Sequence, residues 1–289
     1  MTTTLAPARP GAGAGRITFV ALAAREMRRF VLNPVFLVAV AMTAYWGSGP
    51  GTTVIEIDTV NPYPAIFLGG FGMMAAYWLT RSMRASEPVV GVTPVTQPAR
   101  TAALCAVAIV PFACGGLALL RFVQLIPIGD AAYGPFSPSA RIAVLVGQIV
   151  VPALGGPLLG IALGRWVRFP GAAFVLFLVL FGWGNLTTVP SLSHPDPTTS
   201  TALRMFAPFT FFTFSENGAD VTTWPGSPWF FLGWQLALCA IAVLVALLRG
   251  AENRQRTRIV RTLQIVLVVA AIMFVLAVGG GFTHAVHAR

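Results

Sequence analysis

The residue types that carry most enzyme chemistry are scarce in this chain. All 19 basic residues are arginine, so the sequence has neither the lysine of a standard phosphate-binding loop nor a lysine that could act as a base or form a Schiff base. His284 and His287 have the spacing of helical metal ligands, but no cysteine or carboxylate accompanies them. No hydrolase grouping of serine, histidine and aspartate appears. We therefore expect no catalytic, cofactor or metal site, and any ATP that drives this protein must be hydrolysed by another chain.

Five polar side chains interrupt long apolar stretches and are the candidates for chemistry inside a membrane: Arg121, Gln124, Gln148, Asn185 and Gln235. Arg121 is the costly one, because an arginine at the centre of the hydrocarbon costs about 2.5–3.5 kcal/mol on insertion scales. It lies in the outer half of its stretch, so its guanidinium either snorkels to the surface or faces a substrate path. No carboxylate pair falls inside these stretches, which argues against a proton-coupled carrier.

The composition places these side chains in membrane helices. The 289 residues are 56% hydrophobic and only 10% charged, whereas soluble proteins have about 25% charged residues. A membrane helix needs about 20 apolar residues. The sequence predicts seven spans, at residues 34–48, 64–80, 102–127, 142–164, 171–189, 229–248 and 263–282. We therefore expect an all-α, polytopic transmembrane helical bundle.

The arginines predict the orientation of this bundle. Fifteen of them precede the first span or lie in every second loop, where the only acidic residues are Glu26, Glu87 and Glu252. Because short basic loops stay on the cytoplasmic side, the N-terminus is predicted to be cytoplasmic and the C-terminus external. The formal net charge of +10 is then met by anionic lipid headgroups in a cell membrane, and no nucleic-acid partner is expected.

Two cytoplasmic segments have a pattern beyond that of a connector. The composition of residues 1–15 predicts a flexible tail. Residues 16–32 have arginines on one face of a predicted helix and apolar residues on the other, which is typical of an interfacial helix. The loop from Arg81 to Arg100 combines a carboxylate, an apolar cluster and a turn. It either docks a soluble partner or is merely tethered to the headgroups. The residues concerned are Arg84, Glu87, Val89, Val90, Val92, Thr93, Pro94 and Val95.

The order of these elements resembles the permease subunits of ABC type-2 exporters. The resemblance rests on the arginine-rich run from Arg25 to Leu37, the span pair after it, and Glu87 followed by Thr93-Pro94-Val95-Thr96 before the third span. It covers about residues 16–248. In that family the first element is the elbow helix and the loop holds the coupling helix, which sits in a groove of the ATPase subunit. The family core has six spans, so a seventh, C-terminal helix here is an addition.

The resemblance implies a division of the chain and a set of partners. The elbow helix would be 16–32, the six-span permease core 33–248, and residues 249–289 would form a basic cytoplasmic loop, the seventh span and an external tail. Cofactor ATP would be bound by a separate ABC ATPase, and the pathway would form with a second permease copy or a homologous permease in a bacterial cytoplasmic membrane. The family also has partly re-entrant external helices, which here would fall near 203–215.

Three further interpretations stay open at this point. Gly156, Gly160 and Gly164 form a small-residue face that suits either a subunit contact or packing within the chain. The absence of catalytic groups equally suits a non-transporting membrane protein, such as an assembly factor or sensor. An ion-coupled carrier is a third alternative, although no inverted repeat is visible.

Overall fold

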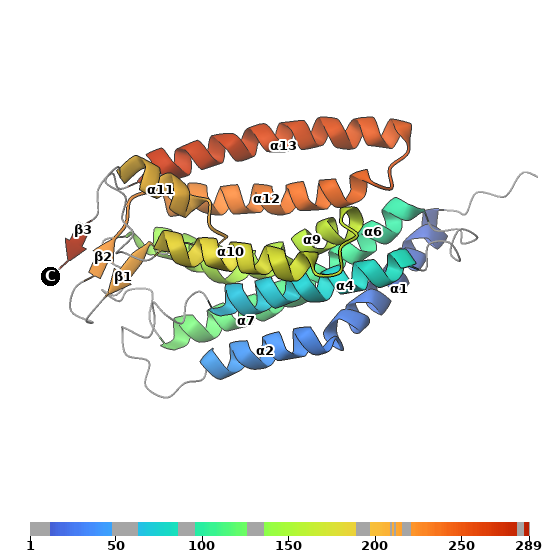
Figure 1. Ribbon diagram of the computed structural model, residues 1–289, viewed down its shortest axis with the longest axis horizontal. Coiled ribbons are helices and arrows are strands. Elements are labelled where there is room, and N and C mark those ends of the chain that lie inside the picture. Colours follow the sequence, from blue (N-terminus) through green and yellow to red (C-terminus); the bar gives the residue numbers. More distant parts are fainter. Residues whose placement is uncertain are drawn as a thin grey trace, which may run out of the picture.

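The structure is an elongated bundle of helices (Figure 1). It is a computed structural model that describes residues 12–47, 63–85, 96–125, 136–188, 197–208, 210, 212–215, 221–281 and 286–288. After α1, the long helical runs alternate in direction between the two ends of the bundle (Figure 1).

The first half of the chain forms three helical runs after an N-terminal helix. That helix is α1 (Ala12–Val31), and α2 (Pro34–Gly47) follows it at a bend of 65°. Asn33 caps the N-terminus of α2, because its side-chain oxygen accepts a hydrogen bond from the Val35 backbone N–H at 3.0 Å. The second run joins the π-helix η1 (Ala65–Phe71) to α4 (Gly72–Ala85). The third consists of α6 (Gln97–Cys105), the 3₁₀ turn η2 (Ala106–Ala108) and α7 (Ile109–Leu125).

The second half adds four longer runs, the short helix α11 and a small sheet. Its first run comprises α8 (Pro138–Leu145), the π-helix η4 (Val146–Val150) and α9 (Val151–Trp166). The other helices are α10 (Ala172–Thr188), α11 (Pro197–Met205), α12 (Pro228–Leu248) and α13 (Asn253–Gly279). The strands are β1 (Thr213–Ser215), β2 (Val221–Thr223) and β3 (Val286–Ala288). They pair antiparallel in the order β1-β2-β3, so the all-α expectation omitted a small sheet.

Several helices have the length and composition of membrane spans. Four qualify among the described residues, namely 97–124, 138–166, α12 and α13, and the bent pair α1–α2 would make a fifth. The helix α10 is apolar but has only 17 residues, short of the ~20 that a span usually needs. A helical, multi-pass membrane protein is therefore confirmed, while the count of seven spans and their orientation stay predictions.

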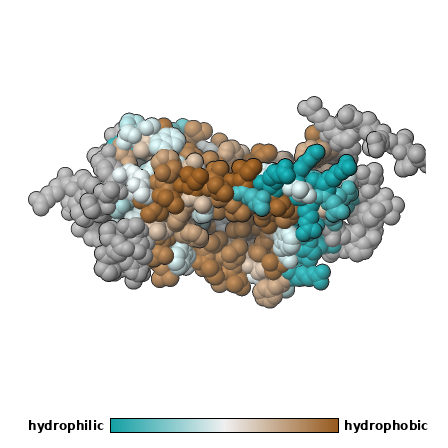
Figure 2. Space-filling view, turned by 90° about the horizontal axis from the view of Figure 1, so that it is seen from above, coloured by the Kyte–Doolittle hydropathy of each residue, from teal (hydrophilic) through white to brown (hydrophobic). Residues whose placement is uncertain are grey.

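The two ends of the bundle differ in character. The last turn of α4, the first turn of α6 and the connections α9–α10 and α12–α13 lie at one end, here called the arginine-rich end, and the strands lie at the other, called the sheet end (Figure 1). The first turns of α13 expose Arg254, Arg256, Arg258 and Arg261. In Figure 2 the middle of the molecule is largely hydrophobic, and hydrophilic residues gather toward the arginine-rich end. This distribution fits an apolar belt between polar ends, as a membrane helical bundle requires.

Candidate functional site: an apolar cavity beside α9

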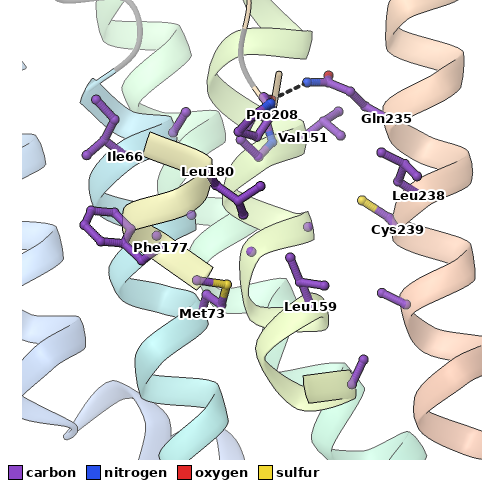
Figure 3. A pocket seen from close by; sticks show the side chains of 18 of the residues that line it. Ile66, Met73, Val151, Leu159, Phe177, Leu180, Pro208, Gln235, Leu238 and Cys239 are labelled. Atoms are coloured by element: carbon purple, nitrogen blue, oxygen red, sulfur yellow. Dashed lines mark hydrogen bonds between the residues drawn. The ribbon is translucent and has the colours of Figure 1, made fainter. Parts of the chain in front are cut away.

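A cavity lies in the apolar middle of the bundle. It has a volume of about 330 Å³, and α9 forms its floor, η1, α4 and α10 one side and α12 the other. Figure 3 shows Phe177 and Leu180 of α10 across from Leu238 and Cys239 of α12, with Leu159 of α9 between them. The lining is apolar apart from the side chains of Gln235 and Cys239. Such a cavity suits an apolar ligand group that one polar contact holds in place.

Glycines let α9 lie directly against the η1–α4 run. A Cβ atom added to Gly156 would fall 2.0 Å from the Gly69 carbonyl oxygen, and one added to Gly160 would fall 2.2 Å from that of Met73. A Cβ on Gly164 would approach the Thr80 side chain at 2.9 Å. The glycine face predicted from the sequence therefore packs within the chain, and α4 and α9 form one closely packed unit.

Irregular helix geometry surrounds the cavity. The π-helix η1 contributes Ile66, Gly69 and Gly70 to the lining, and η4 leads directly into Val151 and Pro152. π-Helical turns widen a helix and occur often at functional sites. Pro157 inside α9 has no N–H to donate to the preceding turn. Irregular geometry is therefore found on the η1 and α9 sides of the cavity, whereas α12 on the opposite side is a continuous α-helix.

Two buried glutamines hold a non-helical segment over the sheet end of the cavity. The Gln235 side-chain N–H donates to the Pro208 carbonyl at 2.7 Å (Figure 3), and that of Gln148 donates to the Thr210 carbonyl. Pro208 itself lines the cavity. Non-helical backbone is tolerated at membrane depth where protein groups satisfy it. Two of the five predicted polar residues are thus brought together, and both bind the segment predicted to be re-entrant, which is not helical at Pro208 and Thr210.

The other three predicted polar residues lie away from the cavity. Arg121 and Gln124 are exposed near the sheet end of α7. Asn185 is exposed on α10, and its side-chain N–H donates to the Phe181 carbonyl one turn earlier at 2.8 Å. None of the three lines the cavity, so the structure does not bring them together with Gln148 and Gln235.

At the arginine-rich end, both sides of the predicted docking loop are attached to the end of α9. The Arg84 guanidinium, on the last turn of α4, donates to the Gly164 carbonyl at 3.2 Å. Arg165 donates to the side-chain oxygen of Gln97, the first residue of α6, at 3.4 Å. The docking residues between these attachments lie outside the described part of the chain; they are Glu87, Val89, Val90, Val92, Thr93, Pro94 and Val95.

The N-terminal helix is attached to the same end. Arg29 pairs with Glu26 at 3.1 Å on α1, and the same guanidinium donates to the Ser82 hydroxyl on α4 at 3.2 Å. Glu26 is only 4% exposed, so the polar face predicted for this helix partly points toward protein. The rings of Phe30 and Phe36, whose centroids are 4.4 Å apart, fill the inside of the bend between α1 and α2.

Sequence reasoning missed two buried arginines. Arg165 is 2% exposed and Arg204 is 4% exposed, although both were counted only as charges in loops. The Arg204 guanidinium donates to the Pro225 carbonyl and lies over the rings of Phe212 and Trp224, at 5.4 and 5.9 Å from their centroids. Burial lowers the pKa of Arg204 to about 9. Their contacts join distant segments, so local spacing gave no signal for them.

Comparisons with known proteins add no family to this geometry. No family description, curated protein or solved structure matches the chain. Within the described residues no group of three or more histidine, cysteine or acidic side chains could hold a metal ion. The function must therefore be argued from the cavity, from α9 and from the attachments of the docking loop.

Proposed function

We propose that this chain is the membrane permease subunit of an ATP-driven exporter of the ABC type-2 kind. The observation that carries the proposal is the double attachment of the docking loop to α9. Arg84 precedes the loop and Gln97 follows it, and both contact the end of the helix that forms the cavity floor. A protein that moves the loop would therefore pull on the cavity directly.

The packing of α9 determines how such a pull would travel. Because Gly156, Gly160 and Gly164 bring α9 into contact with the η1–α4 run, α4 and α9 would move together as a rigid pair. A shift of this pair relative to α10 and α12 would change the width of the cavity. Sliding of packed helices is a recognised way to switch between states. ATP-driven closure of the ATPase would then alternate the permease between inward and outward states.

The N-terminal region supports the same proposal. The bend of 65° between α1 and α2 suits a helix that lies along the membrane surface before the first span enters, as the elbow helix of the resembled family does. Its contact with Ser82 joins it to the last turns of α4, the helix that precedes the docking loop in the sequence. Because the sequence has no lysine for a standard phosphate-binding loop, we assign ATP binding and hydrolysis to a partner ATPase. A second permease copy or a homologous permease completes the pathway in a bacterial cell membrane.

Co-purification with the ATPase encoded beside this chain tests the proposal. The double variant Glu87→Arg/Val90→Asp should lose the complex and its stimulated ATPase activity. If the complex survives these changes, the docking assignment is wrong. If no ATPase co-purifies with the unmodified chain and the chain is monomeric, a non-transporting membrane protein is the better description.

A second pair of variants tests the attachment to α9. Arg84→Gln should leave the complex intact but lower its stimulated ATPase activity by about fivefold or more, the size of a modest coupling free energy. Arg81→Gln is the matched control, because Arg81 lies one turn earlier on α4 and is exposed. Equal activity in the two variants would contradict transmission through α9.

A further inference from the structure

We propose that the outward face of α13 is a docking surface for an anionic phospholipid of the leaflet at the arginine-rich end. Arg258 and Arg261 would bind the headgroup phosphate, and the exposed aliphatic side chains that follow them along the same face would contact an acyl chain. The site needs no ATPase and does not depend on the exporter function proposed above.

Basic and apolar side chains follow one another on a single outward face of α13. At about 100° per residue, the exposed side chains of Arg254, Arg258 and Arg261 fall within about 60° of one another. Ile265 and Ile272 continue this row, here called the α13 stripe, and each is more than half exposed. The buried residues of the helix lie on its opposite side; they are Ile259, Ala270 and Ala277. Figure 2, which views the molecule from the side of α13, shows hydrophobic surface followed by hydrophilic surface toward the arginine-rich end.

The length of α13 places two of these arginines at headgroup depth. From Arg261 to Gly279 the helix has no further charged residue and rises about 27 Å, close to the ~30 Å of the hydrocarbon layer. Arg258 then lies about 4.5 Å, and Arg254 about 10 Å, beyond Arg261 along the axis. The headgroup layer is about 5–8 Å thick on each side. Arg258 and Arg261 therefore lie within it, and Arg254 lies at its outer edge.

The charges around the α13 stripe favour a lipid over another protein. In the part of the chain that the structure describes, Glu252 is the only exposed acidic residue, because Glu26 is buried and paired with Arg29. The described surface of a second copy would therefore bring little negative charge to these arginines. A soluble acidic protein would cover the arginines but not Ile265 and Ile272, which lie at the depth of the hydrocarbon. An anionic phospholipid covers both parts of the stripe at once.

The spacing of the two arginines suits a phosphate group. Arg258 and Arg261 are three residues apart, so their side chains are neighbours on the surface of the helix. Each guanidinium presents paired N–H donors that match the oxygens of a phosphate, and two of them can hold one headgroup. The ammonium group of a zwitterionic headgroup would be repelled by the same pair of charges. The stripe should therefore distinguish an anionic phospholipid from a zwitterionic one.

Native mass spectrometry of the full chain in detergent tests the site without any ATPase. The delipidated protein is titrated with phosphatidylglycerol or with phosphatidylcholine that carries the same acyl chains. We expect the first phosphatidylglycerol to bind with a Kd at least about tenfold lower, a difference of about 1.4 kcal/mol; equal affinities would overturn the proposal. Glycerol phosphate, which has the phosphate but no acyl chain, should not compete even in large excess. Competition by it would show that the apolar part of the stripe has no role, and the lipid assignment would be wrong.

A pair of double variants separates the stripe from the overall charge. Arg258→Gln/Arg261→Gln should raise the Kd for phosphatidylglycerol about tenfold. Arg168→Gln/Arg256→Gln removes the same charge from exposed positions of the arginine-rich end that lie off the stripe, and it should change the Kd less than about threefold. Equal changes in the two variants would mean that binding follows net charge alone, which refutes the site. If the first variant alone lowers the oligomeric mass in the same spectra, a second copy occupies the stripe and the proposal fails.

Discussion

The 138–166 span and α13 are both long and apolar, yet the first is mostly buried inside the bundle and the second is mostly exposed on its surface. In the most apolar 18 residues of each, 61% of the first span are buried in protein and only 11% of α13. Figure 1 shows α13 at the outer edge of the bundle, beside α12. Apolar character therefore predicts that both cross the membrane but not which one lies at the centre.

Small residues explain the difference. The lipid tails are as apolar as leucine, so no hydrophobic force draws one membrane helix toward another, and close packing decides instead. The glycines of α9 allow backbone contact with the η1–α4 run. On α13 the small buried residues are Ala270 and Ala277, and its remaining surface is mostly branched aliphatic side chains, such as Val268 and Val275, which are 60% and 65% exposed. The comparison predicts a graded series of effects on stability.

The largest effect is expected from Gly160→Leu on α9. A Cβ at this position would overlap the Met73 backbone, so α4 and α9 would have to separate. Overpacking of this kind costs about 1–3 kcal/mol and occasionally more. The clash is with backbone atoms, so a change of side-chain rotamer cannot remove it. We expect aggregation, or a fall in melting temperature of roughly 10 °C, in a fluorescence-detected size-exclusion assay.

The matched control for this variant is Gly182→Leu on α10. No atom lies within 4 Å of a Cβ at Gly182 among the neighbours considered, so a leucine there should meet lipid and change the melting temperature little. Equal losses in the two variants would show that the glycines of α9 have no special role in packing. Small residues would then not explain why the 138–166 span is buried and α13 is exposed.

The next largest effect is expected from Arg165→Gln. Arg165 is 2% exposed and contacts Gln97, whereas Arg168 follows it by three residues and is exposed. Hydrogen bonds to a charged group are worth about 1.5–3 kcal/mol, while a surface substitution stays within about 0.5 kcal/mol. Arg165→Gln should therefore lower the unfolding midpoint in a detergent titration, and Arg168→Gln should not. A reversed order would place the wrong arginine in the interior.

A smaller effect is expected where α13 touches its neighbours. The ring of Phe274 lies 5.2 Å from that of Trp234 on α12 and 5.6 Å from that of Phe206, between centroids. Aromatic pairs contribute about 0.5–1.5 kcal/mol beyond their buried area. Because Phe274 is only partly buried, Phe274→Ala should lower stability by roughly 1–2 kcal/mol, measured by the same titration. An effect as large as that of Gly160→Leu would mean that α13 belongs to the centre of the bundle.

The sequence predicted some of these features and not others, for physical reasons. Hydropathy located the long spans, and the spacing of Gly156, Gly160 and Gly164 correctly marked a close helix contact, because both signals are local. The pairing of Gln148 and Gln235 with the 208–210 segment was not visible, since it joins residues far apart in the chain. For the same reason, Arg165 and Arg168 looked alike in the charge pattern. The small sheet was missed because its strands have only three residues each.

The smallest effect is expected on the outer face of α13, and it is the most informative about the assembled protein. Val268 and Val275 face outward on α13 and are 60% and 65% exposed, so Val268→Ala/Val275→Ala removes no packing within the chain. The double variant should unfold within about 0.5 kcal/mol of the unmodified protein and elute at the same mass by light scattering. A change in mass would mean that another protein surface covers this face. In that case α13 would be exposed only in the single chain, and its position would be set by the assembly and not by the lipid.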